Sequence, residues 1–385
     1  MKPLSRRAVV PGMKDSGLVQ KSKSEALSGF GVFALLALHI GLALGLRASS
    51  LLATVHAVFT LLLGIVFAFS NRNTGKLKYV TAYIAGSEVL WRMTNAQMFW
   101  EAGKYFIIFI LGIALLRTKH WQRAGWPVFY FLFLAFSIPL TILAVGASSA
   151  ARDAVSFNLS GPLALTVCAL YFSQITIDED EMRQVIWWLA IPIVSVAALA
   201  LFGTLSAETI TFTDESNFAT SGGFGPNQVS AILGLGGALA FLLFLTGKGA
   251  MLRGLAVGIS LGLLSLSALT FSRGGIYNAA VVVFLALAHS LRDKRWRLFA
   301  VLGLAMIGLA GGYLIYPRLN TFTGGMLQQR FLDTDPTLRG PIARADLAGG
   351  GEAGDRRLPG TPLPPHPQAL PGDDAASEHQ RRIAA

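Results

Sequence analysis

Long apolar runs separated by short polar segments dominate the chain from residue 29 to residue 316. Most of these runs hold roughly 15 to 20 residues, about the length that an α-helix needs to cross the hydrocarbon core of a bilayer. The pattern predicts an all-α, polytopic helical membrane protein with about eleven transmembrane helices. The predicted spans are Gly29–Leu46, Leu51–Ser70, Lys78–Trp91, Tyr105–Leu116, Trp126–Val145, Leu159–Ile177, Val185–Gly203, Gly225–Leu245, Leu252–Leu269, Ile276–Ser290 and Leu298–Tyr316.

The segments on either side of this transmembrane region, residues 29–316, differ from it and from each other. Residues 1–28 form a polar, basic tail, and no small-residue cleavage site follows the first apolar run, so we expect a retained first span. Residues 317–347 are predicted to form an ordered loop. Residues 348–385 are rich in Pro, Gly and Arg and lack aromatic residues, which predicts a disordered tail.

Composition supports the membrane prediction and narrows the chemistry. The 385 residues are 53% hydrophobic and only 14% charged, whereas about a quarter of the residues in soluble domains are charged. The net charge of +11 arises from basic residues in short loops, so it predicts membrane topology rather than nucleic-acid binding. The lone cysteine, Cys168, lies in an apolar run and offers neither a disulfide nor a zinc cluster. We predict no metal and no cofactor.

The distribution of basic residues predicts the orientation of the spans. If the N-terminus is cytoplasmic, the cytoplasmic segments hold nineteen Lys and Arg residues. The opposite short loops then hold five, which are Arg47, Arg92, Lys104, Arg152 and Arg273. Basic residues accumulate on the cytoplasmic side, so we predict that the N-terminus is inside and that Arg273 and everything after Tyr316 face outward.

Ser272-Arg273-Gly274-Gly275 is predicted to be a short polar break between two apolar helices. Arg273 is the only basic residue in its loop, on the side where topology disfavours basic residues. A guanidinium group binds phosphate through two parallel hydrogen bonds, so a lipid diphosphate headgroup is a natural ligand. The alternative is an interfacial arginine that extends its side chain to the lipid headgroups.

Two further sites lie at the predicted outer surface. Asn227 follows Gly225-Pro226 at the start of a span, which is either an ordinary helix start or a helix N-terminus that faces an anion. Glu88 lies at helical spacing from Arg92, near Trp100, in a region that also fits an aromatic belt with local ion pairs. A carboxylate embedded there can act as a general base, so Glu88 is the candidate catalytic residue.

His39 and His56 lie in the first two spans, where they can face each other.

The order of several short motifs resembles that in the O-antigen ligase/polymerase superfamily of bacterial envelope enzymes. The resemblance extends over about Gly29 to Leu347. It is carried by Gly225-Pro226-Asn227-Gln228, Thr270-Phe271-Ser272-Arg273-Gly274-Gly275, Tyr316-Pro317-Arg318, Thr323-Gly324-Gly325, Arg330-Phe331 and Thr337-Leu338-Arg339.

This resemblance implies a glycosyltransferase of the bacterial inner membrane that acts without nucleotide or metal. Such an enzyme moves a glycan from undecaprenyl diphosphate to an acceptor at the periplasmic face. The acceptor is the lipid A core for a ligase of lipopolysaccharide and a growing chain for a polymerase.

In the family, outward arginines hold the diphosphate, and Arg273 and Arg339 fit that role. With Ser272 and Asn227 they form the predicted diphosphate-binding set. The implied partners are the lipid-linked oligosaccharide, membrane lipids and envelope-polysaccharide assembly proteins.

The chain departs from the family pattern near Ala348. Family members continue with a longer loop, which carries a histidine that helps to activate the acceptor, and then with further spans. Here only His366 and His379 follow, in no comparable context. We therefore expect truncation or a shifted reading frame after about Leu347, which would leave the product inactive. A multispan transporter for an anion or small solute and a non-catalytic scaffold are the two competing classes, although no internal repeat supports a transporter.

Overall fold

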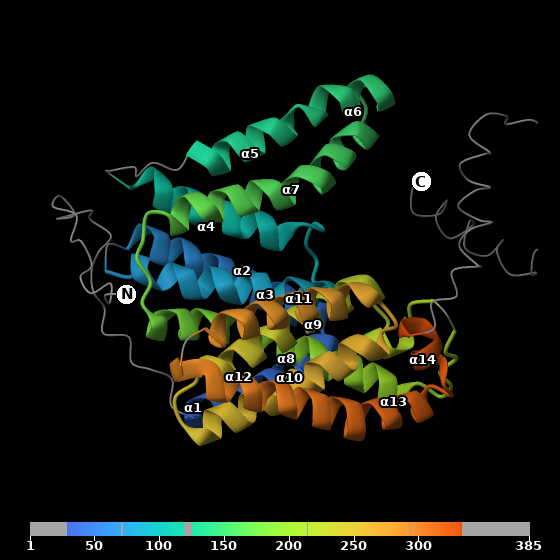
Figure 1. The fold of residues 1–385 in the computed structure, drawn as a ribbon. Helices are drawn as coiled ribbons and strands as arrows, with labels where there is room; N and C mark the ends of the chain where they lie inside the picture. The colour runs from blue at the N-terminus through green and yellow to red at the C-terminus, as the bar shows by residue number, and fades with distance from the viewer. Residues whose placement is uncertain (1–28, 71, 119–124, 214, 293, 333–385) are drawn as a thin grey trace, which may run out of the picture. The chain divides into compact units, whose positions relative to one another are not determined.

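The computed structural model describes residues 29–70, 72–118, 125–213, 215–292 and 294–332. These residues form helices joined by turns and loops, with no strand among them, which confirms the all-α prediction (Figure 1). The elements are α1 (Gly29–Ala48), α2 (Ser50–Phe69), η1 (Thr74–Lys76), α3 (Leu77–Met93), α4 (Ala102–Leu116), α5 (Gly125–Ala135), α6 (Ser137–Val145), α7 (Ser149–Phe172), α8 (Glu179–Ser206), η2 (Ala219–Ser221), α9 (Pro226–Thr246), α10 (Ala250–Leu269), α11 (Arg273–Ser290), α12 (Lys294–Met306), the π-helix η3 (Ile307–Ile315), α13 (Tyr316–Phe322) and α14 (Met326–Phe331).

Eight helical segments of the described chain are long and apolar enough to cross a membrane. They are Phe30–Ala48, Ser50–Phe69, Gly125–Val145, Ser149–Phe172, Glu179–Ser206, Pro226–Thr246, Ala250–Leu269 and Arg297–Phe322. Length and composition thus support a multipass membrane protein. The other three predicted spans correspond to α3, α4 and α11, so the count of eleven stays a prediction.

The interior of the bundle is built around α3, α8 and α9. In the most apolar stretch of α9, 78% of the residues are buried, compared with none in the stretch that comprises α5 and α6. The helices α5 and α6 pack on α7 at the periphery (Figure 1). Hydrocarbon tails solvate exposed apolar side chains, so a membrane helix that is apolar on every side can lie at the edge of the bundle.

Small residues bring the backbones of α9 and α11 into direct contact. A Cβ atom added to Gly275 would overlap with the carbonyl group of Ser230, and one added to Gly234 would overlap with the carbonyl group of Gly275. The Ser230 hydroxyl donates to the Ser272 carbonyl over 2.9 Å. Close packing of this kind is the main source of helix association in lipid. It fixes the first turn of α11 beside the first turns of α9.

Ion pairs and capping groups gather at one end of the bundle. Lys78 and Glu181 join the start of α3 to the start of α8 over 2.6 Å. Asp180 pairs with Lys248, which lies between α9 and α10, over 2.8 Å. Asp178 caps α8 reciprocally with Glu181. The end of α3 and the starts of α9 and α11 therefore lie at the opposite end, as the alternation of the predicted spans requires.

Several predicted boundaries differ from the ends of the helices. The helix α7 begins at Ser149, ten residues before the predicted Leu159, because the Ser148 hydroxyl caps the Ala151 N–H. The predicted polar break at Ser272–Gly275 is instead the first turn of α11, and only Phe271 and Ser272 depart from helical geometry there. Polar residues can occupy the solvated first turn of a helix, so the hydropathy pattern did not reveal these starts.

The last predicted span does not end at Tyr316. The helical path continues through the π-helix η3 into α13, where Pro317 occupies an early position that needs no N–H donor. The helix α14 then follows, so the predicted loop of residues 317–347 is helical over much of its described part. The predicted tails, residues 1–28 and 348–385, lie outside the described residues, as does Arg339.

The contact between α9 and α11 predicts that substitutions at two adjacent glycines differ in their effect on stability. Gly275→Ala forces the two backbones apart, and we expect a loss of stability of about 1–3 kcal/mol, as for other overpacked sites. Gly274→Ala adds a Cβ to open space and is the matched control. Thermal unfolding in detergent measures both. Equal midpoints for the two variants would show that the helices do not touch here.

Candidate functional site

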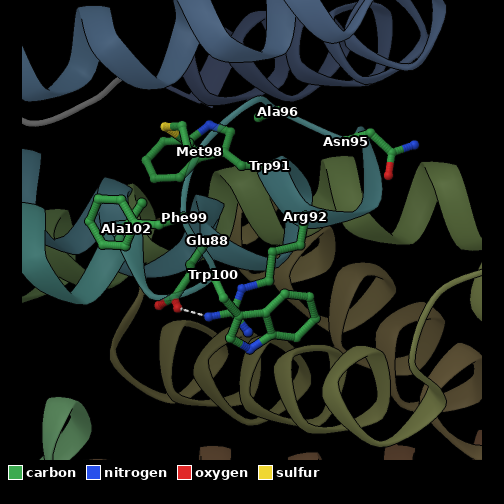
Figure 2. A pocket seen from close by; sticks show the side chains of 10 residues that line it. Glu88, Trp91, Arg92, Asn95, Ala96, Met98, Phe99, Trp100 and Ala102 are labelled. Atoms are coloured by element: carbon green, nitrogen blue, oxygen red, sulfur yellow. Dashed lines mark hydrogen bonds and ion pairs between the residues drawn. The ribbon is translucent and has the colours of Figure 1, made fainter. Parts of the chain in front are cut away.

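A cavity of about 250 Å³ opens between the end of α3 and the start of α4. Aromatic side chains, one carboxylate and one guanidinium group line it (Figure 2). The lining residues are Glu88, Trp91, Arg92, Asn95, Ala96, Met98, Phe99, Trp100, Ala102 and Gly103. The chain reverses direction here between two helices, so the cavity lies at the end of the bundle rather than halfway along it.

Arg92 connects this cavity to α9. Its Nη2 pairs with Glu88 one helical turn earlier, as the spacing predicts, and its Nη1 donates to the Gln228 side-chain oxygen over 2.9 Å. The guanidinium carbon lies 4.5 Å from the centre of the Trp100 ring, and Figure 2 shows the side chain between that ring and Glu88. Three partners from different segments hold the charge in place.

The Glu88–Arg92 pair leaves two polar atoms without hydrogen bonds among the described residues. They are the buried Nε of Arg92 and the second carboxylate oxygen of Glu88. The side chains of Glu88 and Arg92 are only 17% and 14% exposed. The cavity therefore offers the second carboxylate oxygen of Glu88 to a polar ligand or water, whereas the Arg92 Nε is shielded from it.

The first two turns of α9 lie between this cavity and Arg273. Gln228 contacts Arg92, and two residues later Ser230 holds the Ser272 carbonyl at the start of α11. Asn227 is exposed and makes no side-chain hydrogen bond with the described residues. Ser272 is buried, and its N–H donates to the Thr270 hydroxyl over 3.2 Å. The structure thus gathers Glu88, Asn227, Ser272 and Arg273 around one helix N-terminus.

Arg273 is covered by the last described helix. Its Nε and Nη2 donate to the carbonyl oxygen of Arg330, on α14, over 3.1 and 2.7 Å. Arg330 in turn donates from Nε to the Phe271 carbonyl over 3.0 Å. Arg273 makes no ion pair within the described part of the chain, so its charge is balanced only by a neutral carbonyl group.

Phe271 adopts an uncommon backbone conformation directly before Arg273. Its φ of 58° lies in the left-handed region, which costs a bulky residue about 1–3 kcal/mol. Its side chain is fully buried and stacks on Phe212, with ring centres 5.1 Å apart. Such strain persists only where the surroundings determine it, and it concentrates at functional sites.

A chain of hydrogen bonds runs from the cavity into the bundle. The Trp91 indole donates to Nδ1 of His56 over 2.9 Å, and Nε2 of His56 and Nε2 of His39 lie 2.9 and 3.0 Å from the Tyr83 hydroxyl. An indole only donates, so His56 Nδ1 accepts and its Nε2 donates to Tyr83. The Leu35 carbonyl, 2.8 Å from His39 Nδ1, only accepts, so His39 Nε2 accepts from Tyr83. Every polar atom in the chain is satisfied when both imidazoles are neutral.

Sequence reasoning placed His39 and His56 opposite each other but missed the tyrosine between them. The signal was present, because Tyr83, Ser87 and Trp91 recur every four residues along α3 and therefore share one face. Glu101 and Lys104, three residues apart at the start of α4, form no ion pair among the described residues. Instead, Lys104 Nζ donates to the Ser160 hydroxyl over 3.2 Å. Cys168 packs against the apolar core of α2–α4.

No family model, curated protein or solved structure matches this chain. Within the described residues, no group of three or more His, Cys, Asp or Glu side chains is arranged to hold a metal ion. The residues of the site are therefore the basis for a functional proposal.

Removing Arg92 tests whether its pair with Glu88 is buried. Arg92→Leu leaves a carboxylate without its counter-charge, and we expect the stability to fall by about 3–5 kcal/mol. The double variant Glu88→Leu/Arg92→Leu should recover most of that loss. Arg152→Leu breaks an exposed pair with Asp153 and serves as the control, with a change within about 1 kcal/mol. Similar losses for Arg92→Leu and Arg152→Leu would contradict a buried pair.

Tyr83→Phe removes the hydroxyl group that both histidines share. One imidazole donor and one acceptor then stay buried without partners, at a cost of about 1–3 kcal/mol for each. Thermal unfolding should show a clear drop in midpoint. Tyr130→Phe, on the exposed side of α5, is the matched control and should not change it. An unchanged midpoint for Tyr83→Phe would refute the hydrogen-bond chain.

Proposed function

We propose that this protein is a membrane-embedded glycosyltransferase of the O-antigen ligase type. It would act on a glycan carried by undecaprenyl diphosphate. The main support is that the start of α9 meets two arginine-bearing segments: Gln228 accepts from the Arg92 guanidinium, and Ser230 donates to the Ser272 carbonyl, directly before Arg273. A helix N-terminus with arginines beside it is a favourable place for a diphosphate group. The order of the sequence motifs supports the same class.

In the proposed reaction, Glu88 accepts a proton and Arg273 stabilises the leaving group. The acceptor hydroxyl attacks the anomeric carbon of the glycan, and the bond from that carbon to the diphosphate oxygen breaks. Glu88 takes the hydroxyl proton on its second carboxylate oxygen. Arg273, with Ser272 and Asn227 beside it, offsets the charge that develops on the departing diphosphate. Arg339 has the same role by resemblance, and it lies outside the described residues.

The proposed setting is the bacterial inner membrane, with eleven spans and a cytoplasmic N-terminus. The basic residues that set this orientation lie mostly in the loops at the Lys78–Glu181 end of the bundle. The cavity and Arg273 would then face the periplasm, where the diphosphate headgroup of a flipped carrier lies. A cavity at the end of the bundle suits an enzyme that receives a lipid headgroup. Transporters instead bind their substrates near the midplane.

Lipid binding tests this proposal directly. The protein in lipid nanodiscs should bind undecaprenyl diphosphate more tightly than undecaprenol, which lacks the phosphates. Arg273→Lys keeps the charge but loses the two-pronged geometry, and we expect about 10- to 100-fold weaker binding of the diphosphate lipid. Arg47→Lys is the control, because the Arg47 guanidinium packs over the Phe202 ring of α8. Equal affinity for the two lipids would refute the proposal.

Transfer assays then distinguish the reaction classes. Incorporation of a lipid-linked oligosaccharide into lipid A core indicates a ligase, and lengthening of the lipid-linked glycan itself indicates a polymerase. Solute uptake by proteoliposomes, without any transfer, would favour the transporter.

Glu88→Gln should abolish transfer while leaving the affinity for undecaprenyl diphosphate unchanged, since the amide cannot accept the proton.

A further inference from the structure

We propose that α14 is a latch that covers Arg273 and opens when an anion takes the place of the Arg330 carbonyl. The identity of that anion as a diphosphate rests on the proposed function. The latch itself rests on three features of the described residues: the contact made by Arg273, the reciprocal contact of Arg330, and the slight attachment of α14.

The Arg330 carbonyl occupies the part of Arg273 that binds anions best. It accepts from Nε and Nη2 together, over 3.1 and 2.7 Å. The same two nitrogens form the parallel pair of hydrogen bonds in arginine complexes with carboxylates and phosphates. Hydrogen bonds to an ionised oxygen are about twice as strong as those to a neutral one. An anion that reaches Arg273 should therefore displace the carbonyl group.

The reverse contact ties the latch to a strained turn. Arg330 Nε holds the Phe271 carbonyl over 3.0 Å, and Phe271 has a φ of 58°. Phe212 stacks on Phe271 and also meets Phe322 of α13, with ring centres 5.6 Å apart. The last two described helices therefore help to support Phe271 in its unfavourable conformation. Release of α14 removes part of that support, so the turn that presents Arg273 can relax at the same time.

The attachment of α14 is slight enough for it to move as a unit. The helix has six residues, and Leu327 is the only one of them that is buried. Gly324 and Gly325 precede it with φ values of 61° and 86°, in open space. Short segments with few buried contacts open at low free-energy cost, and glycines absorb the changes in backbone angle. The anchor at Leu327, the Arg330 contacts and the hydrogen bonds from the Leu327 and Gln328 N–H groups to the Thr323 and Asn320 side chains, over 3.2 and 3.1 Å, thus hold the latch shut.

Labelling of a single buried thiol measures the opening of the latch. Leu327→Cys, in a Cys168→Ala background, should react slowly with a maleimide while α14 is closed. Adding Arg330→Ala removes the hydrogen bond to Phe271, and we expect labelling about tenfold faster. Inorganic diphosphate should accelerate labelling of the single-cysteine protein, and Arg273→Gln should abolish that response. Ala279→Cys, equally buried on α11, is the control and should not respond to either change.

The outcomes test the latch independently of the proposed enzymatic function. Unchanged labelling in the Arg330→Ala protein, or no response to diphosphate, overturns the latch. Equal acceleration at Ala279→Cys also overturns it, because the whole bundle would then be loosened. A latch that opens with diphosphate in a protein that neither binds undecaprenyl diphosphate nor transfers glycan supports the latch and refutes only the proposed function.

A second measurement guards against disturbance by the cysteine at Leu327. Spin labels at Gln329→Cys on α14 and Phe218→Cys in the loop before α9 both occupy exposed positions. Diphosphate should shift their distance distribution, and Arg273→Gln should prevent the shift. An identical distribution with and without diphosphate contradicts the latch, whatever the labelling rates show.

Discussion

Direct contact between the backbones of α9 and α11 is the constraint on which the candidate site depends. In lipid, apolar surface gains little by moving from hydrocarbon tails to protein, so helices associate where small residues allow close packing and hydrogen bonding. Gly234, Gly275 and Ser230 meet both requirements. Because the two backbones touch, Arg273 lies beside the start of α9, where Gln228 also reaches Arg92.

The charged groups at the two ends of the bundle differ in how they are paired. At the Lys78–Glu181 end, a capping box and ion pairs join several charged groups, and Arg253 and Arg297 donate to backbone carbonyl groups. At the opposite end, Arg92 has an unpaired Nε within the described residues, and Arg273 has a neutral partner instead of a counter-ion. Burial makes incomplete pairing costly, and both Arg92 and Arg273 lie near the start of α9, which favours a binding role there.

The sequence was sufficient to predict the helices because long apolar runs have few other folds in lipid. Each of the eleven predicted spans coincides with a helical segment, and Glu88 and Arg92 pair as their spacing indicated. The boundaries failed where polar residues join a helix, as at Ser149 and Arg273, because hydropathy reports apolar length and not capping. The hydrogen-bond partners of Arg92, Arg273 and Tyr83 could not be predicted from the sequence. Contacts between distant helices depend on packing angles that no local pattern encodes.

The two arginines of the site differ in how their partners can exchange. Arg92 is held by a carboxylate, an amide and an indole ring, so a ligand that displaced Glu88 would have to leave a buried carboxylate unpaired. Arg273 is held by one peptide carbonyl, which returns to solvent at little cost when α14 moves. Arg92 is therefore suited to shaping the cavity, and Arg273 to the exchange of a neutral partner for an anionic one. A site that must bind and then release a charged headgroup needs both kinds of residue, one fixed and one exchangeable.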